Sequence, residues 1–331
     1  MSNETFLWIF SRGIELGVIV LCLLPLRAVL RKKGPRLLSY LLWSALPINV
    51  FFNLCMWMLP KEYRLMGTYV AKKAPVVIPE TSFRVMKIVW LVGTAVVLVG
   101  MLLSYIQFRM RLIGSIRMKE NIYLVGRIKA PFSIGLFHPK IYLPTSVAKE
   151  WQESVILHEK VHIARRDIWM KYIAIAVLGL FWFQPVLWFA YRLFGNDMEE
   201  ACDETVLQKK GRDFREEYAR SLVEVSFHTR KVRGAAVGYG NGVLRARIRN
   251  VMNYKRISGR KFAISILIWV LFVIVAIPIS WQVPRMVHAN DVENKVLQGD
   301  IIVIGTDKTM KEVITEEMIP EDSKGEGNEK D

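Results

Sequence analysis

Long apolar runs dominate the first third of this chain, and another lies closer to its C-terminal end. Four of the runs are long enough to cross a bilayer, because a helix needs roughly 20 apolar residues to span the hydrocarbon core. These predicted spans are Phe6–Leu30, Leu37–Leu59, Val85–Phe108 and Phe262–Trp281. The pattern predicts an α-helical integral membrane protein, with three transmembrane helices in residues 1–108 and a last one in residues 262–281.

Charge is distributed unevenly along the chain, whose formal net charge is +16 at pH 7. Between Val206 and Lys261, directly before the last predicted span, 15 Lys and Arg residues stand against 4 Asp and Glu. Basic flanks stay in the cytoplasm, so we expect residues 109–261 to be cytosolic, and the N-terminus and the short acidic tail of residues 282–331 to be extracellular. We expect the basic positions before the last span to form a solvated or lipid-facing surface. These positions are Arg245, Arg247, Arg249, Arg256, Arg260 and Lys261.

Residues 158–162 read His-Glu-Lys-Val-His, the strongest indication of chemistry in the chain. Two histidines four residues apart lie on one face of a helix, so His158 and His162 can bind the same Zn²⁺. Glu159 would then lie beside the metal, as the general base that takes a proton from the attacking water. The chain has only five histidines in 331 residues, so a chance match is improbable. The spacing predicts one catalytic zinc ion per chain.

A third protein ligand is needed, because catalytic zinc sites combine three protein ligands with one open position. Glu199 and Asp203 lie four residues apart in an acidic segment downstream. We expect Glu199 to ligate the zinc, and Asp203 to orient a histidine by accepting a hydrogen bond from its outer nitrogen. Glu200, which has the same spacing to Glu204, and Cys202 are the alternative ligands. A carboxylate is favoured because it is the documented partner of two histidines in catalytic sites.

A fifth apolar run, Tyr172–Phe194, separates the histidines from these carboxylates. Both sets of ligands must lie on the same side of the membrane to bind one ion, so this run cannot be a simple crossing. Gln184-Pro185 interrupts it, and proline both breaks a helix and pushes the preceding residue out of helical geometry. We therefore expect residues 172–194 to form a re-entrant helical hairpin within the cytosolic domain.

Residues 121–144 have a different character, with short β-branched and aromatic runs between glycines and prolines. Ile122–Val125 and Lys140–Leu143 are predicted strands. The cytosolic domain of residues 109–261 is therefore expected to be of the α+β class. A sheet edge beside the zinc helix would let a polypeptide substrate pair as an additional strand.

Three groups of residues, in this order, resemble the BlaR/MecR family of integral-membrane zinc metallopeptidases. They are Pro131-Phe132-Ser133-Ile134-Gly135-Leu136 with Pro139-Lys140-Ile141-Tyr142-Leu143-Pro144, then His158-Glu159-Lys160-Val161-His162 with Arg165-Arg166-Asp167, then Asn196-Asp197-Met198-Glu199 with Cys202-Asp203-Glu204. The likeness covers roughly residues 5–281. It implies a cytosolic, gluzincin-like zinc metallopeptidase domain. In such a domain the zinc ligands would be His158, His162 and Glu199. Glu159 would be the catalytic base, and Asp203 would be the carboxylate behind the ligands.

The resemblance also implies a function, namely the relay of an envelope signal across the bacterial plasma membrane by cleavage of a cytosolic protein. The resemblance implies a repressor of the BlaI/MecI type as substrate. The apolar runs make the lipid bilayer a second expected partner, and a second copy of the chain, in a homodimer, is a candidate partner, although the sequence does not settle the oligomeric state. Nucleic acid is not expected to bind directly, because no recognition motif accompanies the positive charge. Antibiotic sensors of the family carry an external penicillin-binding domain after the last span, where about 50 residues follow here, so acylation by β-lactams is not expected.

The alternative function is a catalytically silent membrane signalling receptor in which zinc is structural. Glu159 argues against it, because a structural zinc site has no use for a base next to an open coordination position.

Overall fold

The computed structural model describes residues 3–58, 76–78, 80–230, 239–256, 258–282 and 286–288. The segment 59–75 and most of the predicted tail 282–331 lie outside the described residues. The chain is mostly helical, as predicted. The helices are α1 (Asn3–Lys33), α2 (Arg36–Leu41), α3 (Ala45–Met58), α5 (Glu80–Arg111), α6 (Lys149–Ala164), α7 (Asp167–Leu180), α8 (Pro185–Lys210), α9 (Arg215–Arg230), α10 (Tyr239–Met252) and α11 (Gly259–Gln282), with a 3₁₀ turn at Leu42–Ser44 between α2 and α3.

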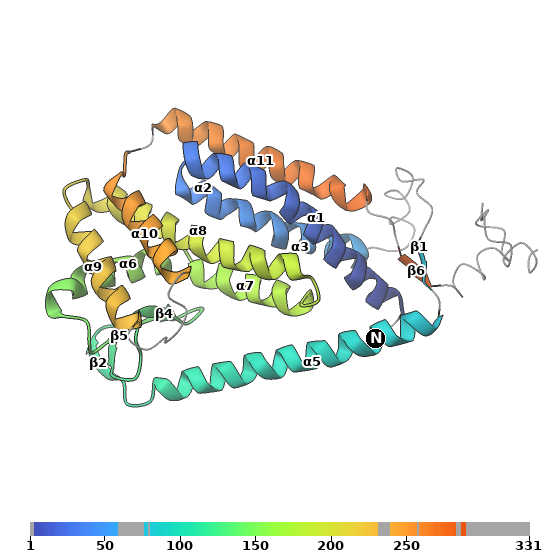
Figure 1. Cartoon of the computed structure of the whole chain (residues 1–331), viewed down its shortest axis with the longest axis horizontal. Coiled ribbons are helices and arrows are strands. Elements are labelled where there is room, and N and C mark those ends of the chain that lie inside the picture. Colours follow the sequence, from blue (N-terminus) through green and yellow to red (C-terminus); the bar gives the residue numbers. More distant parts are fainter. Residues whose placement is uncertain are drawn as a thin grey trace, which may run out of the picture.

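The long helices form a bundle, and α6, α9 and α10 lie with a small sheet at one end of it (Figure 1). Three stretches are long and apolar enough to cross a membrane, namely Phe6–Lys32, Arg36–Met56 and Ser82–Arg111. They coincide with three of the four predicted spans. The fourth lies in α11, whose described apolar stretch is Phe262–Val275.

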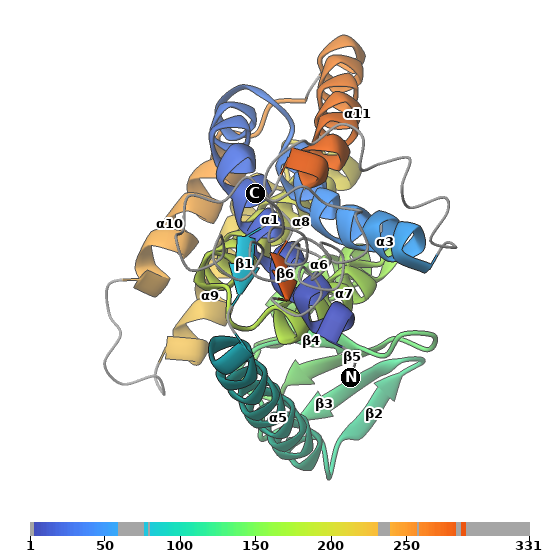
Figure 2. The same ribbon diagram turned by 90° about the vertical axis from the view of Figure 1, so that its right-hand side faces the viewer.

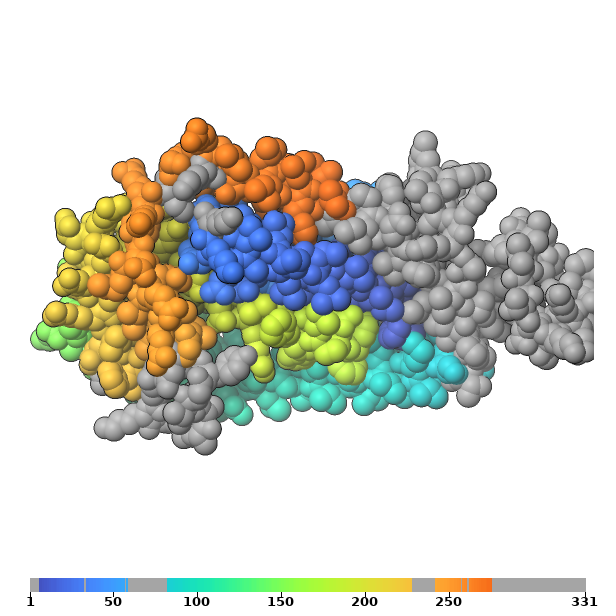
Figure 3. All heavy atoms as spheres, turned by 45° about the horizontal axis from the view of Figure 1, so that its top comes forward, coloured from blue at the N-terminus to red at the C-terminus, as the bar shows by residue number. Residues whose placement is uncertain are grey.

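Helix α5 has an exposed apolar surface, which indicates that the bundle is surrounded by lipid. It runs along the outside of the other helices (Figures 1 and 3), and only 6% of its most apolar stretch is buried against the rest of the protein. Its exposed side chains are aliphatic, with Val96 65% and Leu102 57% exposed. An apolar surface of this length and kind is suited to lipid rather than water. The chain is a membrane protein.

The segment expected to be re-entrant contains a helical hairpin. Helix α7 ends at Leu180, and α8 begins after a short turn at Pro185, a first helical position where proline is well tolerated. At the tip, Gln184 Nε2 donates a hydrogen bond of 3.0 Å to the carbonyl oxygen of Gly13 on α1. A Cβ atom on Gly13 would lie 2.6 Å from the Phe183 ring, so glycine is needed for this close approach. The turn is thus packed on protein, as a turn at membrane depth would have to be.

Four strands form the small sheet at the end of the bundle. They are β2 (Ile116–Lys119), β3 (Ile122–Val125), β4 (Phe132–Ile134) and β5 (Lys140–Pro144), in the spatial order β2-β3-β5-β4. The central pair is parallel and the two outer pairs are antiparallel (Figure 2). The two predicted strands are confirmed as β3 and β5. The sequence did not predict the two edge strands: β2 is exposed along its whole length and alternates with Arg and Lys, and β4 is only three residues long, so neither has the apolar run that marks β3. At the opposite end of the bundle, β1 (Val76–Ile78) pairs with β6 (Met286–His288).

Helix α6 is held between this sheet and helices α8 and α9. Ile141 of β5 packs with Val155 on one side of α6. On the other side, Val161 packs with Val206 of α8 and Tyr218 of α9. Burial of such side chains contributes roughly 1.5–3 kcal/mol each. The helix that carries both histidines is therefore fixed from two sides.

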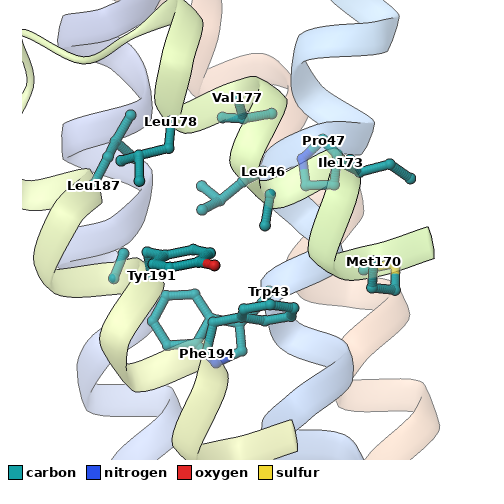
Figure 4. A pocket seen from close by; sticks show the side chains of 12 residues that line it. Trp43, Leu46, Pro47, Met170, Ile173, Val177, Leu178, Leu187, Tyr191 and Phe194 are labelled. Atoms are coloured by element: carbon teal, nitrogen blue, oxygen red, sulfur yellow. The ribbon is translucent and has the colours of Figure 1, made fainter. Parts of the chain in front are cut away.

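An apolar pocket lies among the bundle helices, between the 3₁₀ turn and α3 on one side and the α7–α8 hairpin on the other (Figure 4). Its empty volume is about 460 Å³, part of which is open to the surroundings. Trp43, Tyr191 and Phe194 lie together in its wall.

The hairpin predicts that residues before α7 and residues after the membrane part of α8 lie on the same side of the membrane. Lys149 and Lys209 are exposed on either side of it. In a variant with Cys22 and Cys55 replaced by serine, which leaves only the fully buried Cys202, a cysteine introduced at Lys149 and one introduced at Lys209 should react alike with a membrane-impermeant thiol reagent. We expect both to be shielded in intact cells and both to be labelled after permeabilisation. Labelling of only one of them in intact cells would mean that residues 172–194 cross the membrane.

Candidate metal centre

The two histidines of the sequence motif face one another on α6. His158 and His162 are 9% and 3% exposed. Their Nε2 atoms are 3.1 Å apart, and the rings meet edge to face with centroids 4.7 Å apart. The spacing of four residues thus brings the same nitrogen of each imidazole to one point, as one shared ligand requires.

Glu199 of α8 completes a triangle with these two nitrogens. Its Oε2 lies 3.3 Å from His158 Nε2, and its Oε1 lies 3.6 Å from His162 Nε2. Two atoms that bind one tetrahedral Zn²⁺ at 2.0–2.1 Å are separated by about 3.3 Å. The three observed separations of 3.1, 3.3 and 3.6 Å lie around this value. The side chains are therefore spaced as ligands of one ion.

The outer nitrogen of His162 is held by Asp167, the first residue of α7. His162 Nδ1 lies 2.7 Å from Asp167 Oδ2, and Asp167 is fully buried. Arg166, just before it, has a left-handed φ of 58°, which turns the chain sharply between α6 and α7. Because an ionised carboxylate can only accept, the imidazole donates from Nδ1. The turn after the zinc motif thus fixes the tautomer of His162.

The outer nitrogen of His158 belongs to a longer chain of polar contacts. Its Nδ1 lies 2.7 Å from the hydroxyl of Tyr218, which donates in turn to Asp203 Oδ1 at 2.7 Å. Asp203 itself is 3.5 Å from His158 Nδ1, so Tyr218 stands between the carboxylate and the histidine that we expected it to orient. Arg247 of α10 donates to both oxygens of Asp203 at 2.8 Å and lies 3.2 Å from Glu199 Oε2.

These hydrogen bonds decide which atoms are free to bind a cation. The Tyr218 hydroxyl gives its only proton to Asp203, so it accepts from His158 Nδ1. Both Nδ1 atoms therefore carry protons, and both Nε2 atoms point lone pairs at each other beside a carboxylate. Such a cluster of acceptors is repulsive unless a positive charge lies within it. Two imidazoles and one carboxylate are the donor set that catalytic Zn²⁺ prefers, so the residues present fit the metal.

The electrostatic surroundings of the two histidines and Glu199 also favour a positive charge between them. Burial lowers the pKa of His158, but the negative charge of Cys202 and the hydrogen bonds to Cys202 and Glu199 outweigh it and raise the pKa to about 10. Burial raises the pKa of Glu199, but Arg247 and the two histidines hold it well below its usual range. Positive charge is therefore stabilised among the Nε2 atoms, whether it is carried by protons or by a metal ion.

Glu159, the expected base, is 5% exposed and follows His158 directly on α6. Its carboxylate makes no hydrogen bond or ion pair with any other residue that the structure describes. A buried carboxylate normally has such partners. The absence of competing partners leaves Glu159 able to accept a proton.

The two alternative ligands have different surroundings. Glu200 lies on another side of α8, where it pairs with Arg31 and, at 3.5 Å, with Arg36. Cys202 is close enough to be a donor, since its Sγ and one nitrogen of each histidine lie within 4.8 Å of one another. However, Sγ approaches His158 at Nδ1, at 3.5 Å, where Tyr218 already bonds. We favour Glu199 because it approaches the Nε2 atom of both histidines.

Sequence reasoning missed three residues of the centre. Asp167 lies within one of the resembling motifs, but no role was assigned to it. Tyr218 has no recognisable signal, since it lies 60 positions beyond His158. For Arg247 the prediction was wrong: its side chain is only 17% exposed and binds Asp203, instead of lying on a solvated or lipid-facing surface. The periodicity of α10 turns this one arginine inward.

Fold and site together define a class, a helical membrane protein with a candidate metal centre at one end of its bundle. Residues 7–251 match the family described as BlaR1 peptidase M56, and the chain belongs to that family of membrane signal-transducing metallopeptidases.

Two curated relatives show how far the similarity extends. The regulatory protein BlaR1 of Bacillus licheniformis is 24% identical over 217 residues, which are 55% of this chain and 35% of BlaR1. The methicillin resistance mecR1 protein of Staphylococcus aureus (strain Mu50 / ATCC 700699) is 30% identical over 105 residues, which are 30% of this chain and 18% of that protein. The matched regions thus span about a third or less of these relatives.

Loss of either kind of ligand should remove the metal. We expect His162→Ala and Glu199→Gln each to lower the zinc content of the purified protein far below one ion per chain, because two remaining ligands hold zinc weakly. Atomic absorption measures this directly. Matched controls are His138→Ala and Glu153→Gln, both at exposed positions, which should keep their zinc. A wild-type zinc content in either ligand variant would contradict the assignment.

The contact behind His162 should matter for affinity rather than for the number of sites. Asp167→Asn keeps the size of the side chain but weakens its hold on Nδ1. Loss of such outer contacts typically costs 10–100-fold in metal affinity, and we expect a weakening in this range in competition with a chromogenic chelator. Asp213→Asn, at an exposed position, serves as the control. An unchanged affinity of the Asp167 variant would show that this hydrogen bond does not support the metal.

Proposed function

We propose that this chain is a membrane zinc metalloendopeptidase that transmits an envelope signal by cleaving a cytosolic protein. The observation that carries the proposal is the triangle of His158 Nε2, His162 Nε2 and Glu199 with Glu159 beside it. A Zn²⁺ ion bound there would polarise the scissile carbonyl and the attacking water. Glu159 would take the proton from that water, and Asp167 and Tyr218 would keep both imidazoles in the tautomer that presents Nε2.

A peptide substrate is supported by the sheet beside the zinc helix. Strand β4 is an edge strand that pairs only with β5 among the described strands. The side of β4 away from β5 therefore offers unpaired backbone groups to an extended peptide. Strand β4 also contacts α6, the helix that carries His158 and Glu159. A peptide added at this edge would run alongside the catalytic residues.

The placement of the site in the cytosol rests on charge. The basic segment before the last span favours the cytoplasmic side, and the site residues lie in the same domain, residues 109–261. A cytosolic substrate follows, and the similarity to BlaR1 and mecR1 proteins supports a transcriptional repressor of the BlaI/MecI type. We propose the same domain division as from the sequence, with the last span at residues 262–281 and the acidic tail outside.

The silent-receptor alternative differs from this proposal only in its chemistry. It would use the same ligands, but it would have no use for Glu159. Because Glu159 makes no ion pair with any other described residue, a purely structural zinc site gives its carboxylate beside His158 no role.

Glu159→Gln separates the two readings. Glutamine has the same shape but cannot take a proton, so we expect the variant to fold and to keep one zinc per chain. Cleavage of the repressor in cells, followed by immunoblotting, should fall by at least 100-fold, the lower range of general-base contributions, and the downstream response should disappear with it. Lys160→Gln is the control. A full response in Glu159→Gln cells without cleavage would establish the silent receptor.

A further inference from the structure

Helix α8 presents two acidic faces to two different parts of the molecule. Glu199 and Asp203 face α6 and α10. Asp197, Glu200 and Glu204 are spaced by three and four residues, so they share another face of the helix. The structure shows that this second face is turned toward α1 and α2, the first two helices of the bundle.

Asp197 is the most tightly held residue on this second face. It is 1% exposed, and Arg27 of α1 binds both its oxygens, from Nε at 2.6 Å and from the terminal nitrogen at 2.8 Å. The indole Nε1 of Trp43 donates to Asp197 Oδ2 at 2.8 Å. A bidentate guanidinium–carboxylate pair fixes orientation as well as distance. In the low dielectric of the interior, displacement of either partner leaves a buried charge without compensation.

Weaker contacts extend the same face along α8. Glu200 pairs with Arg31, and the backbone amide of Leu37 donates to Glu204 at 3.3 Å. Arg36 donates to Asn250 of α10 at 3.0 Å. Because α10 also carries the arginine that binds Asp203, helices α1 and α2 are tied to both elements that surround the metal centre.

The geometry of an α-helix links the orientation of Asp197 to that of Glu199. Two residues along an α-helix correspond to roughly 200° of rotation and about 3 Å of rise. Asp197 and Glu199 therefore project to nearly opposite sides of α8, one toward the membrane helices and the other toward the histidines. A rotation of α8 by one residue, roughly 100°, would break the Arg27 pair and turn Glu199 away from both Nε2 atoms.

We propose that Asp197 is a positioning residue of the metal centre, which fixes the rotation of α8 through Arg27 and Trp43 so that Glu199 faces His158 and His162. This inference rests on the proposed function, since it takes Glu199 as the third zinc ligand. The same contacts connect α1 and the 3₁₀ turn directly to the helix that carries Glu199. The Trp43 ring lies in the wall of the apolar pocket (Figure 4), and its Nε1 donates a hydrogen bond to Asp197.

The test measures zinc affinity by chelator competition and the visible absorption spectrum of the Co²⁺-loaded protein, which reports the ligands and their geometry. Asp197→Asn keeps the volume of the side chain and removes its charge, and we expect a loss of zinc affinity of about tenfold or more together with a changed Co²⁺ spectrum. Trp43→Phe deletes one donor and keeps an aromatic ring, and should change the same readouts in the same direction. Glu153→Gln is the control.

The paired variant Arg27→Met with Asp197→Leu separates positioning from stability. Replacement of both partners of a buried ion pair by apolar residues is often neutral for folding, so this variant should melt like the wild type and still bind zinc about tenfold more weakly or worse. Wild-type affinity and spectrum in folded Asp197→Asn, or in the folded pair, would overturn the proposal. If Asp197→Asn and the pair both fail to fold, an unchanged Trp43→Phe overturns it.

Glu199→Gln distinguishes failure of this inference from failure of the proposed function. If Glu199→Gln loses zinc and Asp197→Asn does not, the positioning role is wrong and the zinc site stands. If Glu199→Gln binds zinc like the wild type, the proposed site itself is wrong.

Discussion

Two imidazole nitrogens held 3.1 Å apart with their lone pairs facing are the constraint on which this structure depends. The outer nitrogens of both rings are occupied by Asp167 and Tyr218, so neither ring can relieve the repulsion by changing its tautomer. A proton or a metal ion between them relieves the repulsion, and we propose that the nearby Glu199 supplies the third donor to such an ion. The turn after α6, the tyrosine of α9 and the arginine of α10 all serve to maintain this arrangement.

Helix α8 connects this centre to the membrane bundle. It starts at the tip of a hairpin packed against α1, passes the apolar pocket, and ends beside α6 and α10. One face of it is tied to α1 and α2 by Arg27, Arg31 and Trp43, and another carries Glu199. Under the proposed zinc assignment, a displacement of the membrane helices would reach Glu199 through these packed, charged contacts.

Much of this could be predicted from the sequence, because its strongest signals are periodic. The apolar runs indicated the membrane helices, and strands β3 and β5 were predicted where they occur. The edge strands β2 and β4 were not predicted, since β2 is exposed along its whole length and β4 has only three residues. At the site, the spacing in His158–His162 and in Glu199–Asp203 names residues that share a helical face. Residue spacing within one helix does not identify partners that other helices contribute. For this reason the sequence did not predict that Tyr218 contacts His158 or that the Arg247 side chain points inward to Asp203.

X-ray absorption at the zinc edge tests the central claim most directly, because it measures the atoms bound to the metal. With His158, His162 and Glu199 as ligands, the first shell contains only nitrogen and oxygen at about 2.0–2.2 Å, with the outer scattering of two imidazoles. A sulfur atom at about 2.3 Å that disappears in Cys202→Ser would contradict the account, because it would make Cys202 the third ligand in place of Glu199.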